Sequence, residues 1–206
     1  RASTSPLLQA FTTNRREMVS AVLFASAYGM LFYLSLVYLP EWLHSYEGMP
    51  RGLSLRINTA ATTLLLLLIP VSGLLSDRQF GRTRFIAGAS GVMAMVGVPL
   101  FAWFADKGLW GAIVTQFTLV VLLAVPLGAA PAMFVEMFPA RDRLSGYSVA
   151  YNLGLGVVGG ATPMLATWLI RVTGLPSAPS GLFVAAALLA ILAVSSVHDR
   201  SREPLS

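Results

Sequence analysis

The sequence predicts an all-α integral membrane protein with six transmembrane helices, arranged as a repeat of three plus three. Of the 206 residues, 56% are hydrophobic and only 11% are charged, whereas a soluble domain usually carries about 25% charged residues. The apolar residues form unbroken runs of the roughly 20 residues that cross a bilayer about 30 Å thick. The second run of each trio carries a proline in its later half, Pro70 and Pro163, which indicates an internal repeat.

Polar segments separate the apolar runs and bound the domains. We expect a cytoplasmic N-terminal segment at residues 1–17, a membrane bundle at 18–197 and a cytoplasmic tail at 198–206, with spans at about 18–40, 57–75, 85–105, 109–135, 147–170 and 181–197. A polar loop is expected at residues 41–56 and a short turn at Gly73–Arg84. The third and fourth spans are joined by Asp106-Lys107-Gly108, residue types that favour tight turns.

The distribution of basic residues predicts which membrane face is cytoplasmic. Six spans place both ends of the chain on one side, and that side receives ten basic residues: Arg1, Arg15, Arg16, Arg78, Arg82, Arg84, Arg141, Arg143, Arg200 and Arg202. The opposite side receives four: Arg51, Arg56, Lys107 and Arg171. Because basic residues are retained on the cytoplasmic side, both termini and the Gly73–Arg84 turn are expected there. The net charge of +5 therefore reflects membrane topology, and no nucleic-acid partner is expected.

The residue inventory argues against enzymatic function. Cysteine is absent, so disulfides and Cys-ligated metal sites are excluded, and the sequence has no Gly-rich phosphate loop with a lysine. The two histidines, His44 and His198, lie outside the spans. We therefore predict no enzymatic activity, no cofactor and no metal site. The interiors of the spans contain no Asp, Glu, Lys, Arg or His, so any group that transfers protons lies at a span end or outside this chain.

The turn at Gly73–Arg84 concentrates charge between two apolar runs. Its charged residues are Asp77, Arg78, Arg82 and Arg84, each of which would cost roughly 2.5–3.5 kcal/mol within the hydrocarbon. Asp77 follows the end of a helix, where a carboxylate is disfavoured by about 0.3–1 kcal/mol. We therefore expect Asp77 to be paired with Arg78, with Arg82 or with a helix N-terminus, and Gly81 allows a tight turn. The alternative is a turn whose solvated charges only determine topology.

The same turn resembles a superfamily signature. Gly73, Asp77, Arg78, Gly81 and Arg82 are similar to the G-x-x-x-D-R-x-G-R pattern of the major facilitator superfamily, which occurs in the cytoplasmic loops between helices 2–3 and 8–9. In this chain, two residues separate Arg78 from Gly81, where the usual pattern has one.

Further segments resemble one family within that superfamily. Glu136–Gly154 (EMFPARDRLSGYSVAYNLG), Gly159–Ile170 and Tyr33–Pro40 with Trp42 are similar to the metabolite–proton symporters, which include transporters of proline and betaine, α-ketoglutarate, citrate and shikimate. The resemblance covers nearly the whole chain, in the order of helices 7 to 12. It implies the C-terminal half of a twelve-helix transporter that carries an organic acid or zwitterion by proton symport. An N-terminal six-helix half, or a second copy of the chain, would then be its partner.

The resemblance also implies a location and a gate. Basic residues are almost all arginine, with Lys107 the only lysine, which is typical of GC-rich bacterial genomes, so we expect the bacterial inner membrane. Glu136, Arg141 and Arg143 resemble, together with Arg78 and Arg82, a cytoplasmic charge network that closes an inward gate. The alternative is that Arg141 and Arg143 only anchor the loop. A different function, a membrane interaction or sensor protein that does not transport, also stays open at this stage.

Substrate contacts require polar or aromatic side chains within the spans. The candidates are Tyr28 and Tyr33 in the first span, Gln116 in the fourth, and Tyr147, Tyr151 and Asn152 in the fifth. We favour Tyr151 and Asn152, because an amide within a membrane span must form hydrogen bonds. The alternatives are an interhelical hydrogen bond for Asn152 and helix packing for Tyr28 and Tyr33.

Overall fold

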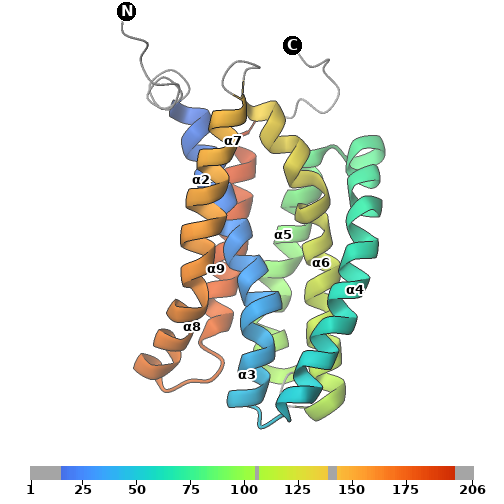
Figure 1. Cartoon of the computed structure of the whole chain (residues 1–206), viewed down its shortest axis with the longest axis vertical. Coiled ribbons are helices and arrows are strands. Elements are labelled where there is room, and N and C mark those ends of the chain that lie inside the picture. The colour runs from blue at the N-terminus through green and yellow to red at the C-terminus, as the bar shows by residue number, and fades with distance from the viewer. Residues whose placement is uncertain (1–14, 105–106, 139–142, 198–206) are drawn as a thin grey trace, which may run out of the picture.

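The computed structural model describes residues 15–104, 107–138 and 143–197, which form a bundle of long helices (Figure 1). The first trio comprises α2 (Arg15–Phe32), η1 (Tyr33–Tyr38) and α3 (Leu39–Ser45), then α4 (Arg51–Leu75) and η2 (Ser76–Phe80), then α5 (Arg82–Pro99) and η3 (Leu100–Phe104). The second trio comprises α6 (Gly108–Met137), then α7 (Arg143–Tyr151), η4 (Asn152–Gly159) and α8 (Gly160–Thr173), then α9 (Pro179–Ser195). The η segments are π-helical and continue the α-helices next to them.

Within the described residues, the helices have the length and composition of membrane spans. Five of them are long and apolar enough to cross a bilayer: Arg15–Ser45, Arg51–Arg78, Arg82–Trp103, Gly108–Met137 and Arg143–Thr173. The sixth, α9, is apolar and has 17 residues, which is at the lower limit for a spanning helix. The protein is therefore an all-α integral membrane protein, as predicted.

The two trios make equivalent contacts with each other, as expected for two copies of one repeat. The first helix of the first trio, α2, packs against the second and third members of the other trio, η4 and α9. The first helix of the second trio, α6, packs against α4 and α5 in the same way, and the third members, α5 and α9, pack against each other. This arrangement is that of a three-plus-three repeat.

Glycines provide the closest contacts at the two equivalent interfaces. A Cβ atom on Gly154 of η4 would lie 2.4 Å from Cβ of Ala25 on α2. A Cβ atom on Gly128 of α6 would lie 2.7 Å from the backbone nitrogen of Gly73 on α4. Small residues at these positions allow the backbones to approach closely.

Two of the predicted connections are shorter in the structure than we expected. The polar loop predicted at residues 41–56 is wrong, because α3 continues to Ser45 and α4 begins at Arg51. The turn predicted at Gly73–Arg84 is also wrong in extent, because η2 continues to Phe80 and α5 begins at Arg82. The charged side chains at these positions do not interrupt the helices. Both of these connections contain a glycine with positive φ, Gly48 at 68° and Gly81 at 76°.

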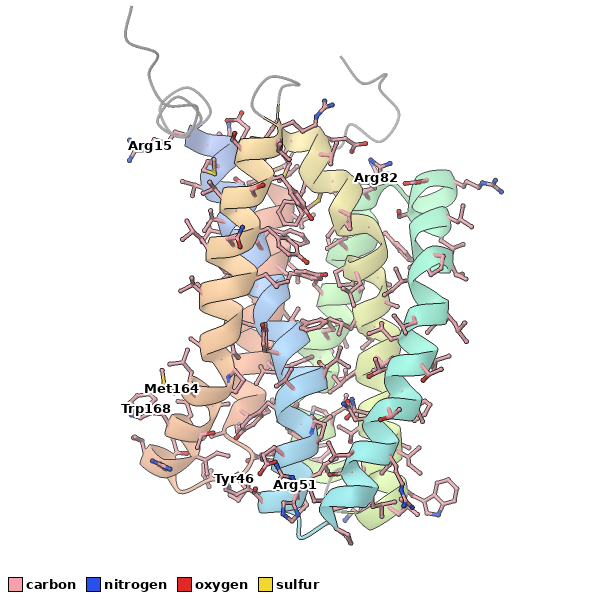
Figure 2. The ribbon with its side chains drawn as sticks, viewed as in Figure 1. Arg15, Tyr46, Arg51, Arg82, Met164 and Trp168 are labelled. Atoms are coloured by element: carbon pink, nitrogen blue, oxygen red, sulfur yellow. The ribbon has the colours of Figure 1, made fainter. Side chains whose placement is uncertain are left out.

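The buried side chains form two clusters, one toward each end of the bundle. Trp42, Phe101 and Phe183 lie in the cluster toward the end that carries Tyr46 and Arg51 (Figure 2). The Nε1 atom of Trp42 donates to the carbonyl of residue 176 at 2.8 Å, which ties the first helix to the connection before α9. The other cluster contains Phe24 and Phe134 and lies toward the end that carries Arg15 and Arg82.

Candidate functional site

Arg82 joins the charged turn to the end of a neighbouring helix. Its Nε atom donates to Oδ1 of Asp77 at 2.9 Å, and its Nη1 atom donates to Oε1 of Glu136. The side chains of Arg82 and Glu136 are 12% and 15% exposed, whereas that of Asp77 is 49% exposed. Glu136 is next to the last residue of α6, where the negative end of the helix disfavours a carboxylate. Arg82 therefore compensates two acidic groups that lie near helix ends.

The local backbone places Arg82 at this point. Gly81 has φ 76° and ψ 142°, and its N–H donates to the carbonyl of Ser76 at 3.1 Å. The hydroxyl of Ser76 donates to the carbonyl of Gly73 at 2.8 Å. Because α5 begins directly after Gly81, its first side chain is directed back toward η2, where Asp77 lies. The glycines of the predicted signature thus have separate roles: Gly73 packs against α6, and Gly81 makes the turn.

The other residues of the predicted charge network lie at different places. Arg78 is exposed on η2, and Arg143 is half-buried at the start of α7. In the part of the chain that the structure describes, Glu136 pairs with Arg82 and not with Arg143. Arg141 lies outside the described residues. The structure therefore brings together Asp77, Arg82 and Glu136.

Glu136 also lines a polar cavity of about 350 Å³. Its lining comes from the start of α2, the end of α6 and the end of α9: Arg16, Glu17, Ser20, Glu136, Met137, Ser195, Ser196 and Val197. The Oγ atoms of Ser20 and Ser196, two of the lining residues, form a hydrogen bond of 2.9 Å. Glu136 therefore contacts Arg82 and also borders a polar space between three helices.

Three of the substrate candidates belong to one aromatic cluster. The rings of Tyr147 and Tyr151 stack with their centroids 5.4 Å apart, and both make edge contacts with Phe134 at 5.6 and 6.4 Å. Tyr28 stacks on Phe24 at 6.2 Å and is only 3% exposed. Tyr28 thus lies in the packed core of this conformation, whereas Tyr147 and Tyr151 are partly accessible.

The remaining candidates make different contacts. Tyr33 is half-buried and makes an edge contact with Phe32 at 5.6 Å. Asn152 is exposed, and its Nδ2 atom donates to the carbonyl of Ser148 at 2.7 Å. Its amide therefore bonds to its own helix in this structure, where we had considered a substrate or an interhelical partner.

Gln116 lies in a polar junction that sequence reasoning identified only in part. Its Nε2 atom donates to the carbonyl of Ser35 on η1 at 2.9 Å and to Oδ1 of Asn58 on α4 at 3.0 Å. No role was predicted from the sequence for Ser35 or Asn58. Two features of the sequence could have indicated this junction: the amide side chain of Asn58 early in the second span, and Pro40, which lies five residues after Ser35. In the described ranges, no group of three or more His, Asp or Glu side chains could hold a metal ion.

The fold and the contacts between the helices define an all-α integral membrane protein built from two equivalent trios of helices, with a charged turn at one end. The chain is 26% identical over 194 residues to the ectoine/proline transporter ProP of Corynebacterium glutamicum, and the match covers 92% of this chain and 38% of that protein. It is 31% identical over 202 residues to the citrate-proton symporter of Klebsiella pneumoniae, with 94% of this chain and 44% of the symporter covered. A proline/betaine transporter of Salmonella typhimurium is 26% identical over 194 residues.

The homologues of this chain are thus metabolite–proton symporters of the major facilitator superfamily, and those named here match more than nine-tenths of its length. The chain spans less than half the length of the curated relatives named above. No family model matches the chain, and no solved structure matches it.

Proposed function

We propose that this chain is the C-terminal six-helix half of a secondary transporter that moves a small polar metabolite, an organic acid or a zwitterion, by proton symport. The observation that carries the proposal is the Arg82 ion-pair network in a chain whose relatives are named as proline/betaine transporters and citrate-proton symporters. The relatives' additional length supports an N-terminal half as the partner, and self-association of this chain is the alternative.

The ion-pair network supports a role as the cytoplasmic gate. Arg82 ties the α4–α5 turn to the end of α6 at one end of the bundle. A carrier that alternates between two conformations needs contacts that exist in only one of them, and a bias of a few kcal/mol is sufficient. In this proposal Gly73 and Gly81 shape the turn, Asp77, Arg82 and Glu136 form the closing contacts, and Arg78, Arg141 and Arg143 add positive charge around them.

Uptake measurements test transport. The chain is reconstituted in proteoliposomes, alone and together with the first six helices of the Klebsiella pneumoniae citrate-proton symporter, and offered L-proline, glycine betaine and citrate. We expect saturable uptake of at least one solute that depends on an inward proton gradient. Uptake only in the presence of the added half supports the half-transporter proposal, and uptake by the chain alone supports self-association. If neither preparation accumulates any solute, the transport proposal is wrong.

The proposed orientation places the Arg82 end of the bundle in the cytoplasm. Figure 2 shows Arg15 and Arg82 at one end of the bundle and Tyr46 and Arg51 at the other. Because the chain has no cysteine, single-cysteine variants give an unambiguous readout. We expect a membrane-impermeant maleimide to label Arg51→Cys in intact cells and to label Arg84→Cys only after the cells are opened. Labelling of Arg84→Cys in intact cells would show that the orientation is the opposite of the one proposed.

A further inference from the structure

The carbonyl of Ser35 has lost its regular helical partner. In the π-helical register of η1, the N–H of Leu39 donates to the carbonyl of Leu34. The carbonyl of Ser35 would accept from the next residue along the chain, but that residue is Pro40, which has no N–H. Within a bilayer an unsatisfied backbone carbonyl is costly, so another donor must replace the missing one.

Gln116 supplies this donor from a different helix. Its Nε2 atom donates one N–H to the carbonyl of Ser35 at 2.9 Å and the other to Oδ1 of Asn58 at 3.0 Å. These two contacts determine how the amide is oriented, because the reversed amide would place its oxygen against two acceptors. A single buried side chain thus links η1, α4 and α6.

Two polar atoms at this junction are left without a partner. The Oε1 atom of Gln116 and the Oγ atom of Ser35 are buried and have no hydrogen-bond partner among the described residues. Gln116 is 0% exposed and Ser35 is 1% exposed. An unsatisfied buried polar atom costs about 1–3 kcal/mol. Because these two atoms belong to residues that a hydrogen bond joins, they favour a further group that is bound there in part of the functional cycle. Asn58 is half-buried, and through it the junction reaches the surface of α4.

The chemistry of the two atoms defines the group that they can bind. An amide oxygen only accepts hydrogen bonds, whereas a serine hydroxyl both donates and accepts. The spans contain no charged side chain in their interiors, so the recognition is through neutral hydrogen bonds. We propose that Gln116 Oε1 and Ser35 Oγ form a binding site for a hydrogen-bond-donating group of the transported solute, an N–H or O–H. This inference rests on the proposed transport function, and alternation between conformations provides access to the closed junction.

Ser35→Ala tests the site, because the hydroxyl that it removes has no hydrogen-bond partner in the described part of the chain. Purified chain in lipid nanodiscs is titrated with L-proline, whose ring nitrogen carries N–H groups, and with glycine betaine, whose nitrogen carries none. We expect the wild-type chain to bind L-proline more tightly than glycine betaine. Ser35→Ala should weaken L-proline binding by about tenfold, the value of one hydrogen bond, without lowering the melting temperature of the ligand-free chain.

The control variant and the uptake assay separate the possible failures. Ser26→Ala removes a buried hydroxyl from the same helix, where it donates to the carbonyl of Val22 at 2.7 Å, and it should leave L-proline binding unchanged. Unchanged binding in Ser35→Ala, a loss of ligand-free stability in that variant, or tighter binding of glycine betaine than of L-proline overturns the site while transport by the wild type stands. If the wild-type chain binds no solute and transports none with or without the added N-terminal half, the proposed function and the site are overturned together.

Discussion

We expect Gly154→Ala to destabilise the bundle strongly and Gly156→Ala to stabilise it slightly, although the two residues lie on the same π-helical segment. A Cβ atom on Gly154 would lie 2.4 Å from Cβ of Ala25 and 2.6 Å from the backbone nitrogen of Ser26. Backbone atoms cannot move aside locally, so α2 and η4 must separate. Overpacking of this kind costs about 3 kcal/mol. Gly156 has no atom within 4 Å of the equivalent position.

The Gly156 variant is the matched control. Replacing an unconstrained helical glycine with alanine stabilises by about 0.5–1 kcal/mol. Thermal unfolding of both variants in the same detergent, followed by tryptophan fluorescence and by the fraction of monodisperse protein, should therefore show shifts of opposite sign. Shifts of the same sign would mean that the α2–η4 contact is not as close as the structure has it. An unchanged melting temperature in Gly154→Ala would lead to the same conclusion.

The sequence was sufficient for the class of fold, because membrane insertion depends on segment hydrophobicity. The extents of the connections were not predictable in the same way. Charged residues such as Arg51 and Arg78 were assigned to a loop and a turn, yet both lie in helices, because a helix that leaves the hydrocarbon continues until a glycine or proline stops it. Only backbone geometry, such as the positive φ of Gly81, shows where the chain reverses.

The candidate site was predictable where local charge determined it. A carboxylate near a helix end required a cation, so Asp77 could be assigned two possible arginine partners from the sequence, and the structure pairs it with Arg82. The junction at Gln116 was not predictable. The loss of the Ser35 hydrogen bond depends on Pro40 and also on the π-helical register, and packing between helices selects that register. Sequence patterns alone do not distinguish it from an ordinary α-helix.

Arg82→Gln is expected to slow transport by more than tenfold while the protein still inserts into the membrane at normal levels. The substitution leaves Glu136, which is only 15% exposed, without its charged partner. A hydrogen bond to a charged group contributes about 1.5–3 kcal/mol, and every 1.4 kcal/mol corresponds to about tenfold in a conformational equilibrium. Arg84→Gln is the control, because Arg84 is exposed two residues further along α5. It should transport at the wild-type rate.

The partners of Arg82 should differ in their effects, since their burial differs. Asp77→Asn removes a carboxylate that is 49% exposed, and an exposed pair contributes only about 0–1 kcal/mol, so uptake should fall less than in Arg82→Gln. Combining Arg82→Gln with Glu136→Gln removes both charges of the less exposed pair, so the carboxylate left without Arg82 is that of Asp77, which is half exposed to solvent. We therefore expect the double variant to recover part of the uptake lost in Arg82→Gln. Initial uptake rates in proteoliposomes of the wild type, Arg82→Gln, Glu136→Gln and the double variant form a double-mutant cycle. Additive losses, or wild-type uptake by Arg82→Gln, would show that the ion pair does not control the gate.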